Sequence, residues 1–455
     1  MSHIAADGGN ALLRLERAIA NANHEIPLIR HGGRVNEIAP GYYRIAGLSR
    51  HLMLGERVSL ESARGPVIGE VVRIDAEAAT VKPYDSNPVA RLGDIAWRMG
   101  PLTIAPSQSW KGRIINALGQ PADGKGPLAF GERSYMTEGS PPAATRRQRV
   151  NKALSTGIRV IDLFTPICAG QRVGIFAGSG IGKSTLLAML AHSQGFDTIV
   201  VALVGERGRE VRDFVEETMK DNLERTVVVV ATGDESAMLR RQAPATAMTI
   251  AEHFRDRGES VLLIVDSITR YAHACREVAL AAGEPPVARG YAPSVFGDIP
   301  KLLERAGPGE DGLGSITGVF AVLVDGDDHN DPVADSVRGT LDGHVVLDRA
   351  IAEQGRYPPV NVLGSISRLA HHVWTSEQRN LVVKLRALVA RYEDTRDLRL
   401  LGSYQPGSDP ELDQAVHLVP RIYEFIRQSP GAPMTAAVFK ELAEALSGPP
   451  PEKPA

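Results

Sequence analysis

The stretch that decides the fold is Ala177-Gly178-Ser179-Gly180-Ile181-Gly182-Lys183-Ser184-Thr185. It follows an apolar run at 173–177 that predicts a strand, and it precedes a helical pattern at 184–191. A glycine-rich loop that ends in Gly-Lys-Ser between a strand and a helix is typical of a phosphate-binding loop. Its backbone amides and the positive end of the new helix suit a polyphosphate. The alternative, a glycine-rich turn without a ligand, does not explain the lysine and the hydroxyl that follow.

The glycines of this loop provide backbone amides for the phosphates, and two side chains, those of Lys183 and Ser184, provide further ligands. Lys183 is placed to neutralise the β- and γ-phosphates, and Ser184 supplies a hydroxyl for Mg²⁺. Ala177 stands where the usual pattern has its first glycine. The predicted nucleotide-binding set comprises Gly178, Ser179, Gly180, Ile181, Gly182, Lys183, Ser184 and Thr185.

Strand-like and helix-like segments alternate from about residue 150 to 370. Further apolar runs of strand length lie at 198–204, 226–231, 261–265 and 318–324, and helical patterns at 211–222 and 236–257 lie between them. Such alternation indicates an α/β fold with parallel strands and crossover helices.

Two carboxylates follow these strands. Asp266 ends the run at 261–265, and strand ends at the carboxyl edge of a parallel sheet form its ligand crevice, so we expect Asp266 near Lys183, holding Mg²⁺ through water. Glu206 lies just after the run at 198–204 and is the candidate general base, while Arg207 is a candidate contact to the γ-phosphate. Spacing alone leaves a second reading open, since a glutamate is also favourable in the first turn of an exposed helix.

The rest of the chain divides into three further parts. Residues 1–24 carry an amphipathic helix at 10–21 that either packs on its own domain or docks on a partner or membrane surface. Short β-rich runs predict a β-barrel at 25–95, followed by the α/β domain at 96–375 with a connecting loop region at 117–145. Residues 376–455 predict a helical domain that ends in a frayed tail.

Composition limits the function classes. Among 455 residues, Lys and Arg number 51 and Asp and Glu 54, and this balance argues against a surface built for nucleic acid. The only cysteines are Cys168 and Cys275, which cannot form a disulfide framework. No run approaches the roughly 18 apolar residues of a membrane span, and no secretory signal is visible, so we expect a cytoplasmic protein, with peripheral membrane attachment left open.

A set of motifs resembles the ATPases of type III protein export, with flagellar export nearest, then virulence secretion and, more distantly, the catalytic β subunit of rotary ATP synthases. The resemblance spans roughly residues 25–425. The motifs that carry it are Gly178–Ser184, Gly205–Glu210, Asp266–Ala272, Gly290–Phe296, Glu304–Gly307 and Gly343–Arg349.

The resemblance implies a RecA-like P-loop core between the barrel and the helical domain, and a homohexamer that binds ATP and Mg²⁺ between neighbouring subunits. It implies that Glu206 activates water and that Arg368, in the segment 365–368, is an arginine finger for the adjacent subunit's ATP. It also implies that Tyr357 stacks on adenine; the alternative is simple loop packing beside two prolines.

The implied function is ATP hydrolysis that releases chaperones and unfolds substrates at the cytoplasmic face of an export gate. The implied partners are a stator-like negative regulator at the N-terminal helix, a coiled-coil stalk in the ring, the export gate, export chaperones and their substrates, with no specific nucleic acid.

Three alternatives remain. One is a virulence secretion ATPase. A rotary synthase subunit is disfavoured because residues 402–411, where the β subunits have a densely acidic loop, are not densely acidic here. An RNA-dependent hexameric translocase needs a basic, aromatic-bearing barrel, and residues 25–95 offer few aromatics beyond Tyr42, Tyr43 and Tyr84.

Overall fold

The computed structural model describes residues 29–86, 89–324, 331–435 and 437–447. The chain forms two compact units, Met1–Pro101 and Leu102–Ala455. The amphipathic helix expected at 10–21 lies outside the described residues. In the described parts of the chain, no helix is long and apolar enough to cross a membrane.

The first unit contains a closed barrel of six antiparallel strands in the order β1-β2-β5-β4-β3-β6. Alternate side chains such as Val58 and Leu60 fill its interior, as the period of two in each strand requires. The predicted limit at residue 95 falls at the start of β6, which closes the barrel by pairing with β1 and β3. The strands are β1 (Gly32–Ala39), β2 (Tyr42–Ala46), β3 (Arg57–Ser62), β4 (Gly65–Ile74), β5 (Ala78–Pro83) and β6 (Ile95–Gly100).

The second unit is built on one sheet with strand order β19-β18-β12-β17-β15-β13-β14-β8. All pairs along it are parallel except β18 with β19, and the short β16 (Gly307–Pro308) adds to β17. This confirms the predicted α/β class and its parallel core. The strands are β8 (Ile114–Asn116), β12 (Arg172–Ala177), β13 (Thr198–Val204), β14 (Thr226–Ala231), β15 (Ser260–Asp266), β17 (Ser315–Leu323), β18 (Gly343–Val346) and β19 (Ile366–Ser367).

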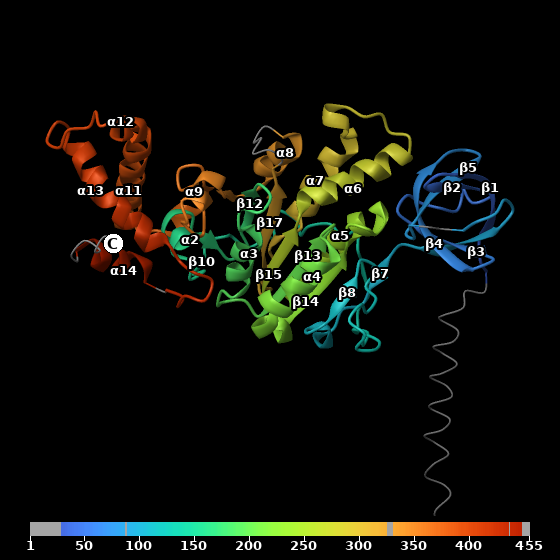
Figure 1. Cartoon of the computed structure of the whole chain (residues 1–455). Helices are drawn as coiled ribbons and strands as arrows, with labels where there is room; N and C mark the ends of the chain where they lie inside the picture. The colour runs from blue at the N-terminus through green and yellow to red at the C-terminus, as the bar shows by residue number, and fades with distance from the viewer. Residues whose placement is uncertain (1–28, 87–88, 325–330, 436, 448–455) are drawn as a thin grey trace, which may run out of the picture. The chain divides into compact units, whose positions relative to one another are not determined.

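Helices cover both faces of this sheet (Figure 1), which explains why its strands are continuous apolar runs. In β13, Val200 and Ala202 pack on one face and Ile199 and Val201 on the other. The first face lies against α5 (Ala237–Arg255), α6 (Ile268–Ala281), α7 (Pro293–Glu304) and α8 (Pro332–Thr340). The second lies against α2 (Arg159–Phe164) and α3 (Lys183–Ala191), and apolar side chains of the C-terminal region join the same buried cluster.

The C-terminal region is helical, as predicted, and contacts α2, which belongs to the same buried cluster. Its helices are α11 (Ser376–Asp394), α12 (Arg396–Leu400), α13 (Pro410–Ile426) and α14 (Val438–Ser447). Thr375 begins α11 with a capping box, in which its hydroxyl accepts from the amide of Gln378 and the Gln378 side chain accepts from the amide of Thr375.

One helical prediction is wrong in detail. The pattern at 211–222 predicts a single helix, but α4 covers only Gly208–Asp213. A π-helical turn at Phe214–Thr218 and a 3₁₀ turn at Lys220–Arg225 follow it. Apolar periodicity marks the buried face of all three and does not distinguish their hydrogen-bond patterns.

Candidate active site

The glycine-rich loop joins the end of β12 to the start of α3. Gly180 and Gly182 have φ of 75° and 101°, a region that favours glycine. Gly182 precedes α3, and its carbonyl accepts from the amide of Leu186. Ala177 is the last residue of β12, buried and not among the residues with positive φ, so its position does not require glycine.

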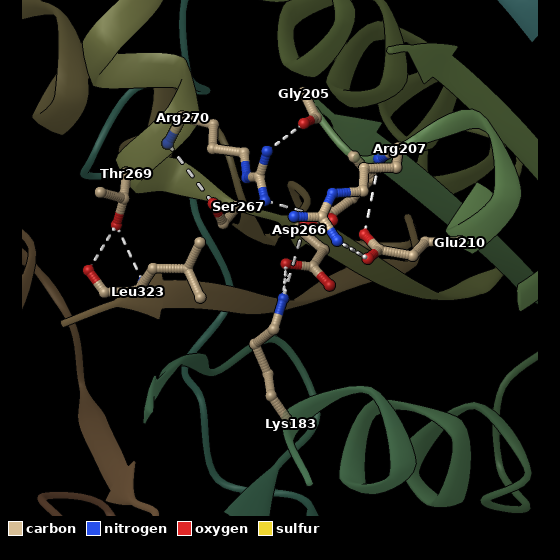
Figure 2. A network of polar contacts seen from close by, with 10 residues as sticks. Lys183, Gly205, Arg207, Glu210, Asp266, Ser267, Thr269, Arg270 and Leu323 are labelled. Atoms are coloured by element: carbon tan, nitrogen blue, oxygen red, sulfur yellow. Dashed lines mark hydrogen bonds and ion pairs between the residues drawn. The ribbon is translucent and has the colours of Figure 1, made fainter. Parts of the chain in front are cut away.

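Three charged side chains meet at the carboxyl ends of neighbouring strands. Lys183 forms an ion pair with Asp266 at the end of β15, and its Nζ lies 3.8 Å from Oε1 of Glu206, which follows β13. The side chains of Lys183, Asp266 and Glu206 are 10%, 5% and 12% exposed. Figure 2 shows Lys183 rising from the loop towards Asp266. The structure thus brings together three residues that are spread over 83 positions of the sequence.

The Glu206 carboxyl lies in a mostly buried site with charges of both signs. Burial, then the charge of Asp266, raises its pKa to about 7, while Lys183 and Arg270 oppose that rise. A carboxyl with a pKa near neutrality is suited to exchanging a proton at physiological pH.

Arg270 is a member of this site to which the sequence assigned no role. It lies in the first turn of α6, and its Nη2 is 3.5 Å from Oε2 of Glu206. Its guanidinium also donates to the carbonyl of Gly205, so one side chain holds both residues after β13. The sequence signal that could have identified Arg270 is its place in the motif Asp266–Ala272, four residues after Asp266.

Arg207 lies apart from Lys183 in this structure. Its side chain is 79% exposed, and its Nη1 is 3.5 Å from Oε1 of Glu210 in the first turn of α4 (Figure 2). The hydrogen bond between Glu206 and Glu210 lowers the pKa of the Glu210 carboxyl. The contact of Arg207 with a γ-phosphate stays a prediction.

Oxygen donors suited to a hard divalent cation flank Lys183. Ser184 is exposed in the first turn of α3, and the carboxylate of Asp266 faces the same loop. Hydroxyl and carboxylate oxygens fit Mg²⁺, which keeps several waters and shares substrate phosphates. Among the described residues, no group of three or more His, Cys, Asp or Glu side chains could hold a metal.

A cavity of about 270 Å³ lies beside the loop. Tyr357, 47% exposed, lines it together with Gly182, Thr185 and Met189. Its other wall comes from residues 427–430, after α13. The sequence did not indicate these residues, because about 70 positions separate them from Tyr357 and no motif marks them.

Arg368 lies at the opposite edge of the sheet from the glycine-rich loop. It follows β19, and its amide donates to the carbonyl of Asp342, whose own amide donates to Arg172 at the start of β12. The six residues of β12 separate the two edges by roughly 20 Å at about 3.3 Å per residue. Arg368 is exposed, and this separation is longer than its side chain, so it does not reach the loop of its own chain.

Family models match most of the second unit. The nucleotide-binding domain of the ATP synthase alpha/beta family matches residues 157–367, and the T3SS EscN ATPase C-terminal domain matches residues 374–444.

Relatives of the chain are named for flagellar and virulence systems. The flagellum-specific ATP synthase of Agrobacterium fabrum is 58% identical over 421 residues, which cover 92% of this chain and 89% of that protein. The SPI-2 type 3 secretion system ATPase of Salmonella typhimurium is 44% identical over 367 residues, with 80% and 84% covered.

Two solved structures have the same fold. The assembled ATPase EscN of the enteropathogenic E. coli type III secretion system superposes with a TM-score of 0.85 at 37% identity, covering 91% of this chain and 99% of that chain. EscN in complex with its central stalk EscO gives a TM-score of 0.81 at 36% identity, with the same shares covered.

Proposed function

We propose a function from one premise: this chain belongs to the ATP synthase alpha/beta family, and within it to the flagellar and type III secretion ATPases. It is an ATP hydrolase of protein export, and its relatives favour flagellar export over the virulence alternative. The observation that carries the chemistry is the meeting of Lys183, Glu206 and Asp266 at the strand ends beside the glycine-rich loop.

In this proposal the loop amides and Lys183 bind the phosphates of ATP. Lys183 then exchanges its contact with Asp266 for the β- and γ-phosphates, which releases the Asp266 carboxylate. Ser184 and Asp266 hold Mg²⁺, which neutralises phosphate charge when bound. Tyr357 stacks on adenine in the adjoining cavity.

Glu206 orients and deprotonates the attacking water in the same proposal. Arg270 holds the Glu206 carboxyl and the Gly205 carbonyl, which limits where the base can point. Positive charge at the γ-phosphate comes from Lys183, from Arg207 after a rotation away from Glu210, and from Arg368 of a neighbouring copy. The site of one chain is then incomplete without a second.

We also propose an assembly and a place in the cell, on the basis of the same relatives. The relative EscN is described as assembled and as bound to a central stalk, so we propose a homohexamer that receives a coiled-coil stalk. Further proposed partners are a stator-like regulator at the N-terminal segment and the export gate, chaperones and substrates. The ring would act in the cytoplasm, peripherally at the inner face of the membrane, to release chaperones and unfold substrates.

The test of this function is specific ATPase activity against protein concentration, with and without RNA. Activity per chain is expected to rise steeply with concentration, because assembly completes each site, and to be indifferent to RNA. Activity per chain that does not change with protein concentration, and that rises when RNA is added, would contradict the proposal and favour a nucleic-acid translocase.

The pH dependence of turnover tests Glu206. Because the pKa of the Glu206 carboxyl is about 7, most of it is protonated below pH 7, and the protonated form cannot accept a proton from water. We therefore expect kcat/KM, which reports the free enzyme, to fall up to about tenfold per unit below pH 7 and to level off above it.

Glu206→Gln is the control, because the γ-phosphate itself takes up protons in this range. The variant should bind ATP but turn it over about 10²–10⁴-fold more slowly. The fall of kcat/KM below pH 7 that is caused by protonation of Glu206 should be absent, and only the fall caused by protonation of ATP should remain. Near-normal turnover by Glu206→Gln would exclude it as the base.

A further inference from the structure

The cavity beside Tyr357 has two walls that lie far apart in the sequence, and one buried residue, Gln428, connects them to each other and to a third region. The first wall is the loop around Tyr357 and the start of α3; the second is the segment 427–430. Gln428 lies in that segment and is 5% exposed. Its backbone amide donates to the carbonyl of Tyr357 at 2.8 Å, so it contacts the first wall directly.

Both polar atoms of the Gln428 side chain form hydrogen bonds with a third region of the chain, residues 157–159. Its Oε1 accepts from the amide of Arg159 at 2.9 Å, and its Nε2 donates to the carbonyl of Gly157 at 2.9 Å. Arg159 is the first residue of α2, whose preceding residue Ile158 provides no side-chain cap. Gln428 therefore satisfies a helix amide that local sequence leaves open, from 269 positions away.

The turn at residues 155–159, to which Gln428 binds, has hydrogen bonds of its own. The Asp162 carboxylate accepts from the amides of Thr156 and Gly157, both at 2.9 Å. It also accepts from the hydroxyls of Thr156 and Ser155. The position of this turn therefore does not depend on the cavity. Gln428 binds both the turn and the Tyr357 carbonyl, so it fixes one relative to the other.

We propose that Gln428 is a positioning residue for the nucleotide base. By bridging residues 157–159 and the Tyr357 carbonyl, it fixes the position of the segment 427–430 in the wall of the cavity that Tyr357 lines. It does not touch the base through its side chain, whose two polar atoms are already bonded. This inference rests on the proposed stacking of adenine on Tyr357, and it makes nucleotide affinity depend on the C-terminal helical region.

The experiment compares ATP with inorganic tripolyphosphate, which has phosphates but no base. Gln428→Met keeps the volume of the side chain and removes both of its hydrogen bonds. We expect the KM for ATP to rise about tenfold with kcat changed less than about twofold, and the inhibition constant of tripolyphosphate to stay constant. Gln428→Glu keeps the acceptor for Arg159 but sets a second carboxylate oxygen against the Gly157 carbonyl, so it should also raise the KM for ATP. It replaces the Met variant if that variant does not fold.

Two controls separate a positioning role from a structural one. Gln242→Met removes a buried glutamine on α5 outside this cavity and should lower the melting temperature without raising the KM for ATP. Tyr357→Ala reports on the stacking itself, and should raise KM at least as much as Gln428→Met.

The outcomes are distinct. An unchanged KM in both Gln428 variants, with a raised KM in Tyr357→Ala, would overturn the role of Gln428 and leave the base site in place. An unchanged KM in Tyr357→Ala would overturn both. A parallel rise in the inhibition constant of tripolyphosphate would also overturn the inference, since the defect would then lie in the phosphate site.

Discussion

Lys183→Ala is expected to lose tight binding of MgATP, by at least about a hundredfold in Kd, and to lose detectable turnover. The ammonium supplies the positive charge that the loop amides cannot, and it offsets the neighbouring carboxylates of Asp266 and Glu206. Without it, the phosphates would enter a site whose nearest side chains are acidic. Titration calorimetry with ATP and a steady-state phosphate-release assay measure the two effects.

Lys183→Arg is the matched control because it keeps the charge but replaces a compact ammonium with a wider planar group. We expect it to retain part of the binding and little of the turnover. Binding of MgATP by Lys183→Ala at the original affinity would contradict the assignment of the loop as the phosphate site.

Arg368→Ala is expected to lower kcat about 10³-fold or more while leaving nucleotide affinity within a few-fold. The side chain lies at the amino edge of the sheet, about the length of β12 from the loop of its own chain, so in the proposed function it would act on a neighbour's ATP. Single-turnover hydrolysis and equilibrium nucleotide binding separate the two quantities.

Light scattering must accompany that measurement, since loss of assembly would lower turnover as well. Arg64→Ala removes an exposed arginine at the turn between β3 and β4 and should leave kcat unchanged. If Arg368→Ala assembles normally and hydrolyses ATP at the original rate, the arginine-finger assignment is wrong.

The core of the fold could be predicted because its strands are buried on both faces. The runs at 198–204 and 226–231 match β13 and β14 residue for residue, since a strand covered on two sides has no polar interruptions. The meeting of Lys183, Glu206 and Asp266 followed in turn from the parallel topology, which brings carboxyl ends to one edge.

Other features had no local signal. The edge strand β8 is only three residues long, and the chain near it predicted a connecting loop. The orientation of Arg207 depends on Glu210 competing for its guanidinium, which spacing does not reveal. The wall at 427–430 reaches Tyr357 through Gln428, whose partners lie about 270 positions away. Such long-range contacts depend on tertiary packing alone.

We propose that each ATP site takes Glu206 from one chain and Arg368 from the next. Equimolar mixing of Glu206→Gln with Arg368→Ala tests it most directly, because each variant carries the residue that the other lacks. In randomly mixed rings about one interface in four contains both intact residues, so we predict that two nearly inactive proteins regain up to about a quarter of the original activity. A mixture that forms joint assemblies, as subunit exchange would report, and yet stays as inactive as its components would contradict the claim.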